Sequence, residues 1–356
     1  MSTLRPAILA IGLLLALAPA RLAAQKPLES LWYTVDSEES IQGFIRNADM
    51  VSIVAPQSYR MDEHGTLWGD VDPRLVKVAR EKGVKIVPLI VNPGFDQPMF
   101  HALLNNPVAR AKAVANIQAL CRDRDYDGIQ FDFENIHIND RDAFTAFYRE
   151  TAKALHDVGC TISVAAVPRD SDYPGENAYH KWMFEYWRGA YDYKALADAG
   201  DFISIMTYDQ HTRRTPPGPV AGLAWMERVV KFLLDQGVPA SKISLGIPAY
   251  SVYWYPTYDE RNGGRQWGSG VSYASAIGLL EAAGVTPVMD DRNKTFFGIW
   301  ENNGVHEYVY LENAETFRHK LDLARKYDLR GFSVWRLGQE DPAVWDLLRG
   351  QRIAGR

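Results

Sequence analysis

Eight short apolar runs alternate with segments of helical pattern, and this alternation constrains the fold of the chain more than any other feature. Runs such as 84–91 are nearly all apolar, which is typical of strands buried on both faces. Alternating strands and helices predict a parallel sheet. Eight units, with no glycine-rich phosphate loop after the first strand, favour an α/β fold of the closed (β/α)8 TIM-barrel type over a doubly wound sheet. The expected strands are 31–35, 50–55, 84–91, 128–134, 161–167, 201–208, 243–249 and 331–337, and the main expected helices are 37–47, 73–82, 107–121, 139–158, 219–236 and 312–327.

Two segments fall outside this rhythm. Residues 1–24 combine an early positive charge, an apolar run and small residues before Gln25, which predicts a cleaved secretory signal peptide rather than a membrane span. Residues 251–310 are rich in Gly, Tyr and Trp and predict a small α+β insertion between the seventh and eighth strands, with a helix over 273–283. We therefore expect a secreted or periplasmic protein that forms one barrel over 25–356.

Charge and composition narrow the range of partners. Loss of Arg5 and Arg21 with the signal peptide takes the formal net charge from −5 to −7. Without basic clusters, this balance argues against nucleic acid or an anionic membrane as a partner. The histidines show no metal-ligand spacing, so we expect neither a metal nor a cofactor. We expect the mature protein to be a monomer that stays off the membrane.

The two cysteines, Cys121 and Cys160, each lie just before a predicted strand in consecutive units, so they could be close in space. Export would permit a disulfide between them. Two buried free thiols fit the sequence equally well, and both readings stay open here.

The predicted fourth strand carries an unusual polar face. From Gly128 onward apolar and polar side chains alternate, so that Asp132 and Glu134 project from the same side, roughly 7 Å apart along the strand. Two carboxylates this close raise one another's pKa, which can keep one of them protonated near neutral pH. The alternative is an edge strand whose acidic face is simply solvated.

The other strand ends help to decide between these two interpretations. In a (β/α)8 barrel the active site lies at the carboxyl ends of the strands. Those ends supply an acid pair, a Tyr-Asp pair and a tryptophan, a convergence that a purely structural barrel would not need. The polar and aromatic residues at these ends are Gln57, Tyr59, Asn92, Asp132, Glu134, Met206, Tyr208, Asp209, Tyr250, Trp335 and Arg336.

Five motifs now make a family resemblance clear, because the chain resembles glycoside hydrolase family 18 along nearly its whole mature length. It is most similar to the branch that contains spore-cortex-lytic glycosidases and di-N-acetylchitobiase. The motifs, in the family's order, are YDGIQFDFE at 126–134, MTYDQH at 206–211, GPVAG at 218–222, GIPAY at 246–250 and GFSVW at 331–335.

The resemblance implies retaining cleavage of β-1,4 bonds next to N-acetylglucosamine, with the substrate's own acetamide as the nucleophile. It implies that Glu134 is the general acid, that Asp132 orients the acetamide and that Tyr208 hydrogen-bonds the acetamide oxygen. Trp335 would form the floor under the sugar. The residues expected to contact or support the substrate are Asp209, Trp335, Gln57, Tyr59, Asn92, Gln130, Met206, Tyr250 and Trp254.

One departure from the family and two rival functions complete the sequence-based hypotheses. Many chitinases carry an acid where this chain has Gln130, so we expect an altered pH profile, with the amide still bonded to Asp132. A catalytically weak, lectin-like barrel is the main alternative, although the presence of Glu134 argues against it. A partner-binding protein on the same scaffold is a further one. The natural glycan could be a chitin oligosaccharide, peptidoglycan or the chitobiose core of glycoproteins.

Overall fold

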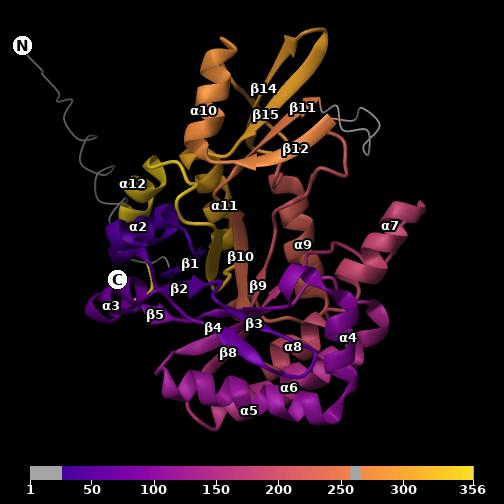
Figure 1. Ribbon diagram of the computed structural model, residues 1–356. Helices are drawn as coiled ribbons and strands as arrows, with labels where there is room; N and C mark the ends of the chain where they lie inside the picture. Colours follow the sequence, from indigo (N-terminus) through magenta and orange to yellow (C-terminus); the bar gives the residue numbers. More distant parts are fainter. Residues whose placement is uncertain (1–25, 257–265, 356) are drawn as a thin grey trace, which may run out of the picture.

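The computed structural model describes residues 26–256 and 266–355 (Figure 1). The signal peptide expected over 1–24, and part of the insertion expected over 251–310, lie outside the described residues. Within the described ranges, no helix is both long enough and apolar enough to cross a membrane.

The strands form a curled, largely parallel sheet. Neighbouring strands pair in the order β1–β2 and then, from the third unit, β6–β7–β8–β9–β10–β16, with β16 returning to β1. The barrel strands are β1 (Glu29–Thr34), β2 (Ile53–Pro56), β5 (Lys85–Ile86), β6 (Leu89–Val91), β7 (Gly128–Asp132), β8 (Thr161–Ala166), β9 (Phe202–Ile205), β10 (Ile243–Pro248) and β16 (Gly331–Trp335).

The third barrel strand is divided into β5 and β6, and these two halves close the barrel. β5 pairs with β2, whereas β6 pairs with β7. Pro88 lies between them and has no N–H for a ladder, but its carbonyl accepts a hydrogen bond from the Gln130 N–H at 3.0 Å. The Val87 N–H still donates to the Val54 carbonyl at 3.0 Å. The segment therefore stays bonded to both neighbours, and the predicted (β/α)8 barrel is confirmed.

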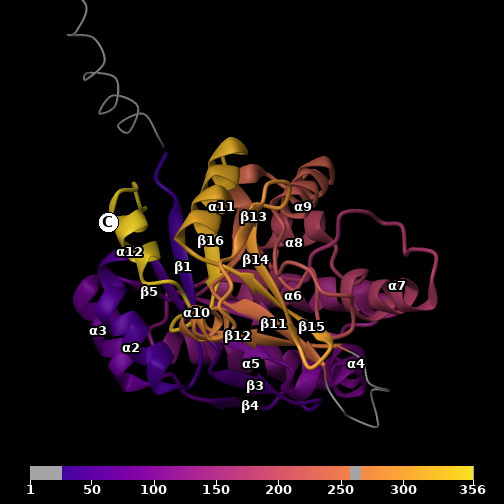
Figure 2. The ribbon, with the colours of Figure 1, turned by 90° about the horizontal axis from the view of Figure 1, so that it is seen from above.

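Helices cover the outside of the barrel (Figure 2). Their starts follow from local capping chemistry. For example, the Asn106 side chain accepts hydrogen bonds from the first turn of α5, and Pro107 occupies the first helical position. The sequence analysis missed α4 and α12. The covering helices are α2 (Glu38–Asn47), α3 (Pro73–Lys82), α4 (Gln97–Asn105), α5 (Pro107–Asp123), α6 (Arg141–His156), α8 (Tyr193–Ala199), α9 (Leu223–Asp235), α11 (Ala314–Lys326) and α12 (Ala343–Arg349).

The insertion forms a small subdomain above the carboxyl end of β10 (Figure 1). It has a five-stranded antiparallel sheet in the order β12-β11-β15-β14-β13 and one helix. Ala276 and Leu280 of the helix pack against Val309 and Leu311 of the sheet. Its elements are β11 (Ser251–Pro256), β12 (Gln266–Val271), α10 (Tyr273–Ala282), β13 (Val288–Asp290), β14 (Thr295–Asn302) and β15 (Val305–Leu311).

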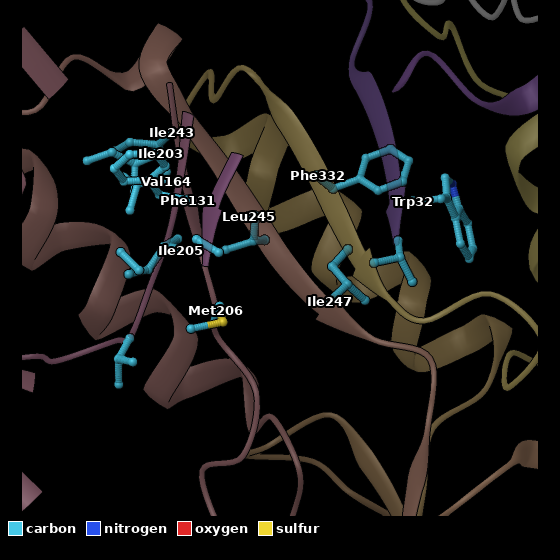
Figure 3. Close-up of a cluster of buried hydrophobic side chains, with 14 of the residues drawn as sticks. Trp32, Phe131, Val164, Ile203, Ile205, Met206, Ile243, Leu245, Ile247 and Phe332 are labelled. Carbon is cyan, nitrogen blue, oxygen red and sulfur yellow. The ribbon is translucent and has the colours of Figure 1, made fainter. Parts of the chain in front are cut away.

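The two faces of the barrel strands have different surroundings. Outward-facing side chains such as Trp32, Phe131 and Val164 build the main apolar core between strands and helices (Figure 3). Inward-facing positions are partly polar. The Ser333 hydroxyl is 2.6 Å from that of Ser204 and 2.9 Å from that of Ser244. The barrel interior beneath the strand ends is therefore hydrogen-bonded rather than purely apolar.

A disulfide joins Cys121 and Cys160, which lie 39 residues apart in sequence. This settles the question that the sequence left open. Cys121 lies in the last turns of α5, and Cys160 comes directly before β8. The bond therefore lies at the amino-terminal end of β7 and β8, opposite to the strand ends where the predicted site residues gather.

Candidate active site

A cavity of about 670 Å³ opens at the carboxyl ends of the barrel strands. Its size falls in the range of small-molecule and oligosaccharide sites. Both the barrel and the loops that follow the strands contribute to it. The lining residues on or just after barrel strands include Tyr33, Gln57, Asp132, Glu134, Met206, Tyr208, Asp209, Tyr250 and Trp335.

Asp132 and Glu134 enter the cavity from the end of β7. The strand's outward side chains, Phe131 and Phe133, are fully buried in the core, and the Phe133 ring stacks on Phe100 with centroids 4.4 Å apart. That packing fixes the strand's orientation and turns its polar face inward. The predicted alternation is therefore observed, and the alternative of a solvated edge strand does not hold.

The backbone that carries Glu134 is held by side chains from neighbouring units. The Asn92 amide donates to the Glu134 carbonyl at 2.8 Å and accepts from the Glu134 N–H at 3.0 Å. The Tyr191 hydroxyl donates to the Phe133 carbonyl at 2.7 Å. These bonds position the glutamate after the strand ladder has ended, as a catalytic side chain needs.

Burial and mutual repulsion keep the paired acids protonated at unusually high pH. Burial raises the pKa of Asp132 to about 6, although a 3.3 Å hydrogen bond from the Gln57 amide opposes the shift. Burial also raises the pKa of Glu134 well above 4.5, with added repulsion from Asp132 and Asp209. A glutamate with a raised pKa can act as a proton donor near neutral pH.

A second polar group comes from the loop after β9. The Tyr250 hydroxyl donates to the Asp209 carboxylate, and its ring packs edge-on against that of Tyr208, with centroids 6.4 Å apart. Burial raises the pKa of Asp209. Within the described residues the Tyr208 hydroxyl has no hydrogen-bond partner, so it can donate to a ligand.

Aromatic rings line the cavity on the side of β16 and β1. Trp335 ends β16, and its ring lies 5.5 Å from that of Tyr33 on β1. The Tyr33 hydroxyl lies 2.6 Å from the Ser204 hydroxyl in the barrel interior. The sequence analysis missed Tyr33, although the alternation within 31–35 places it on the inward face of the first strand.

Two residues expected to contact sugar are buried away from the cavity. Strand β2 ends at Pro56, and Tyr59 begins a separate short strand, β3 (Tyr59–Met61). Tyr59 therefore does not share a strand face with Gln57. The Tyr59 hydroxyl instead meets that of Tyr126 at 2.8 Å. Trp254 is fully buried in the insertion, against Gly268. The expectation of sugar contact is therefore wrong for Tyr59 and Trp254.

Asn92 and Gln130 also lie outside the cavity lining. Asn92 is 1% exposed, and its amide is used by the Glu134 backbone. Gln130 lies two residues before Asp132 on the same face of β7 and is fully buried. Its amide donates to the Ser163 hydroxyl at 2.9 Å. The expected bond from Gln130 to Asp132 is therefore wrong, because the amide of Gln57, which follows β2, makes that contact. Both residues support the site rather than touch a ligand.

The loops contribute further residues that the sequence analysis did not identify. The loop after β8 brings Tyr179, Met183, Trp187 and Arg188 to the cavity, and the loop after β9 brings Arg213 and Arg214. The first four lie on α7 (Ala178–Met183) and on the helical turn Phe184–Arg188, within 179–199, which the aromatic pattern predicts to be helical in part. That pattern does not show which of these side chains reach the cavity. Among the described residues no group of three His, Cys, Asp or Glu side chains is arranged to hold a metal ion.

Comparison with known proteins identifies the class to which this fold and site belong. The family model for glycosyl hydrolases family 18 matches residues 35–340. The chain belongs to this family, as its motifs predicted, and is a glycoside hydrolase.

Individual relatives confirm the branch of the family. The chain is 26% identical to the cortical fragment-lytic enzyme of Bacillus subtilis, over 88% of this chain and 71% of the relative. It is 23% identical to human di-N-acetylchitobiase, over 79% and 77% of the two chains. The crystal structure of a chitinase from Chromobacterium violaceum superposes with a TM-score of 0.81 at 27% identity, over 92% of this chain and all of the other.

Proposed function

We propose that this protein is an exported, retaining glycoside hydrolase that cleaves β-1,4 bonds at N-acetylglucosamine with the help of the substrate's acetamide. The observation that carries the proposal is the set formed by the buried Asp132 and Tyr208 and the half-buried Glu134, all of which line the cavity. A chitin oligosaccharide or a peptidoglycan-type glycan would both supply the required sugar.

Glu134 is the proton donor in this proposal. Burial and the repulsion from Asp132 and Asp209 raise its pKa, which favours the protonated form that can donate to the glycosidic oxygen as the bond from that oxygen to C1 breaks. The resulting carboxylate then removes a proton from the water that attacks C1. Asn92 supports this exchange by fixing the backbone of Glu134 on both sides.

Asp132 and Tyr208 hold the acetamide. The acetamide oxygen attacks C1 and forms a cyclic oxazolinium intermediate, so that two inversions give net retention. The Asp132 carboxylate accepts the acetamide N–H and stabilises the positive charge, while the unpartnered Tyr208 hydroxyl donates to the acetamide oxygen. Asp209, which accepts from Tyr250, lies beside this seat, and the sugar ring stacks on Trp335.

The Cys121–Cys160 disulfide supports the proposed export, because such bonds persist in oxidising compartments. The predicted signal peptide points to the same secreted or periplasmic location.

The test compares wild type, Glu134→Gln and a control, Glu185→Gln, on a chromogenic N-acetylglucosamine oligomer. Glu185 is exposed and lies outside the cavity lining. We expect the kcat of Glu134→Gln to be lower than that of wild type by a factor of about 10²–10⁴, while Glu185→Gln keeps the wild-type rate. Proton NMR of the first product should show the β-anomer, and an oligomer with hydroxyl in place of acetamide should resist cleavage. Equal rates for wild type and Glu134→Gln, or an α-anomeric first product, would reject the mechanism.

A further inference from the structure

The charged side chains that line the cavity are divided between its floor and its loops. The carboxylates of Asp132, Glu134 and Asp209 come from the ends of β7 and β9. Three guanidinium groups, those of Arg188, Arg213 and Arg214, come from the loops after β8 and β9. A neutral amino-sugar chain would need the floor but would have no counterpart for three positive charges.

Two of the arginines lie against tryptophans on opposite sides of their loop. The Arg214 guanidinium is 5.0 Å from the ring centroid of Trp182, which lies on α7 (Ala178–Met183). The Arg213 guanidinium is 5.4 Å from the ring centroid of Trp267 on β12 of the insertion. Stacking on an aromatic face holds a guanidinium in place and leaves its N–H groups free to bind an acceptor.

The third arginine is anchored through its backbone. Arg188 ends the helical turn Phe184–Arg188, and its carbonyl accepts from the buried guanidinium of Arg169 at 3.0 Å. The Nε atom of Arg188 is buried, with no hydrogen-bond partner among the described residues. Because this atom is covered by protein, Arg188 faces the cavity through its other atoms.

None of the three arginines has an acidic partner within residues 26–256 and 266–355. Two other arginines do pair with carboxylates of the loop after β8. Arg169 pairs with Asp172 at 2.9 Å, and Arg228 of α9 pairs with Asp170 at 2.9 Å. The carboxylates of Asp170 and Asp172 are therefore already paired, and within the described ranges the three cavity arginines are left without an acidic partner.

From this division of charge we infer that the enzyme's preferred substrate is a β-1,4-linked N-acetylglucosamine glycan that carries carboxylate groups, and that Arg188, Arg213 and Arg214 bind those groups. The inference rests on the proposed function and adds the charge of the substrate to it. Arginine suits this task because its fork of N–H groups matches the two carboxylate oxygens. The carboxylate could belong to a 3-O-lactyl ether on the sugar or to a peptide attached to it.

The test uses matched tetrasaccharides in which N-acetylglucosamine alternates with its 3-O-lactyl derivative. One form has free carboxylates, the second has them converted to amides, and the third carries a short peptide that ends in a carboxylate. For wild type we expect kcat/KM to be about tenfold higher on a carboxylate form than on the amide form, mostly through KM. A higher value on the first or on the third form identifies the source of the carboxylate.

The arginine variants supply the decisive comparison. In the triple variant Arg188→Gln, Arg213→Gln and Arg214→Gln, the ratio of kcat/KM on the carboxylate form to kcat/KM on the amide form should fall towards one. Raising the salt concentration should lower this ratio in wild type but not in the triple variant. Arg318→Gln, which removes an exposed charge on α11, is the matched control and should keep the preference. Equal kcat/KM on all forms, or a preference that survives in the triple variant, overturns the inference while hydrolysis itself upholds the proposed function.

If wild type cleaves the chromogenic N-acetylglucosamine oligomer but none of the three glycans, the proposed function stands and the inference is overturned. If wild type cleaves neither the oligomer nor the glycans, the proposed function fails and binding decides the inference. Calorimetric titration of wild type with the carboxylate and amide forms should then still show tighter binding of the carboxylate form. Equal affinities would overturn it.

Discussion

Among the regions of this molecule that bury carboxylates, two treat the charge in opposite ways. Where the insertion returns to the barrel, the 4%-exposed Glu312 pairs with the equally buried ammonium of Lys320 and accepts from the Thr316 hydroxyl at 2.6 Å. At the end of β7, Asp132 and Glu134 have no cationic partner among the described residues, and only Gln57 bonds Asp132.

The difference separates a structural charge from a reactive one. Burial raises the pKa of Glu312 as well, but the Lys320 ammonium and the Thr316 hydroxyl oppose that rise, so this carboxylate has partners that favour its ionised form and serves packing and orientation. The buried Asp132 and the half-buried Glu134 have no such cation among the described residues, and burial raises the pKa of both, which costs stability and prepares a proton donor. The acid strand is therefore the part of the fold where stability gives way to chemistry.

The largest change in stability is expected at the ion pair between Glu312 and Lys320. Lys320→Met leaves Glu312 buried and unpaired, so the free energy of unfolding should fall by about 3–5 kcal/mol, as measured by urea denaturation. The double variant Lys320→Met, Glu312→Leu should recover most of the loss, because no buried charge remains. A fully stable single variant would show that the pair is not buried in solution, and the contrast between the two regions would collapse.

At Asp132, removal of the charge is expected to raise stability rather than lower it. The rise of the Asp132 pKa from 3.8 to about 6 means that the folded state holds this proton more tightly than the unfolded chain does. Stability linked to this group is therefore complete below pH 3.8 and lost as pH rises through about 6, by about 3 kcal/mol. Asp132→Asn removes this loss, so it should melt higher than wild type at pH 8 and nearly together with it at pH 3.5. A lower melting temperature at pH 8 would contradict this account.

The smallest effect is expected at Gln130, directly below the acid pair. Gln130→Asp places a third carboxylate in the barrel interior, which raises the pKa of Asp132 and Glu134 by repulsion. Both limbs of the pH–rate profile should move to higher pH, and stability at neutral pH should fall by about 2 kcal/mol. Gln130→Asn is the control for altered size. An unchanged profile in Gln130→Asp would remove the expected link between this position and the acids.

Much of the fold could be predicted because barrel strands leave a strong sequence signal. All eight predicted strands coincide with observed ones to within a few residues, since buried parallel strands are continuous apolar runs. The division of the third strand at Pro88 was missed because its two halves form one such run. The short helices α4 and α12 were missed as well, because too few turns are present to establish a period.

The site was harder to predict wherever it depends on more than one segment. Asp132, Glu134, Tyr208 and Trp335 lie at strand ends, and the predicted fold alone is enough to bring them together. Tyr59 was misplaced because it lies on a strand separate from β2, so the alternation of faces along β2 does not extend to it. The roles of Asn92 and Gln130 depend on partners in neighbouring units, which no single-segment pattern encodes.

The disulfide also constrains the chain when it is not folded. Its bridge closes a loop that contains the whole of β7, Glu134 and α6. In the chain-entropy view, a loop of this length raises the free energy of the unfolded state by about 4 kcal/mol. That gain is made at the end of the barrel away from the cavity, so it can offset the cost of burying two unpaired acids without touching their chemistry. An oxidising environment would thus allow this enzyme to keep a reactive strand that its packing alone supports less well.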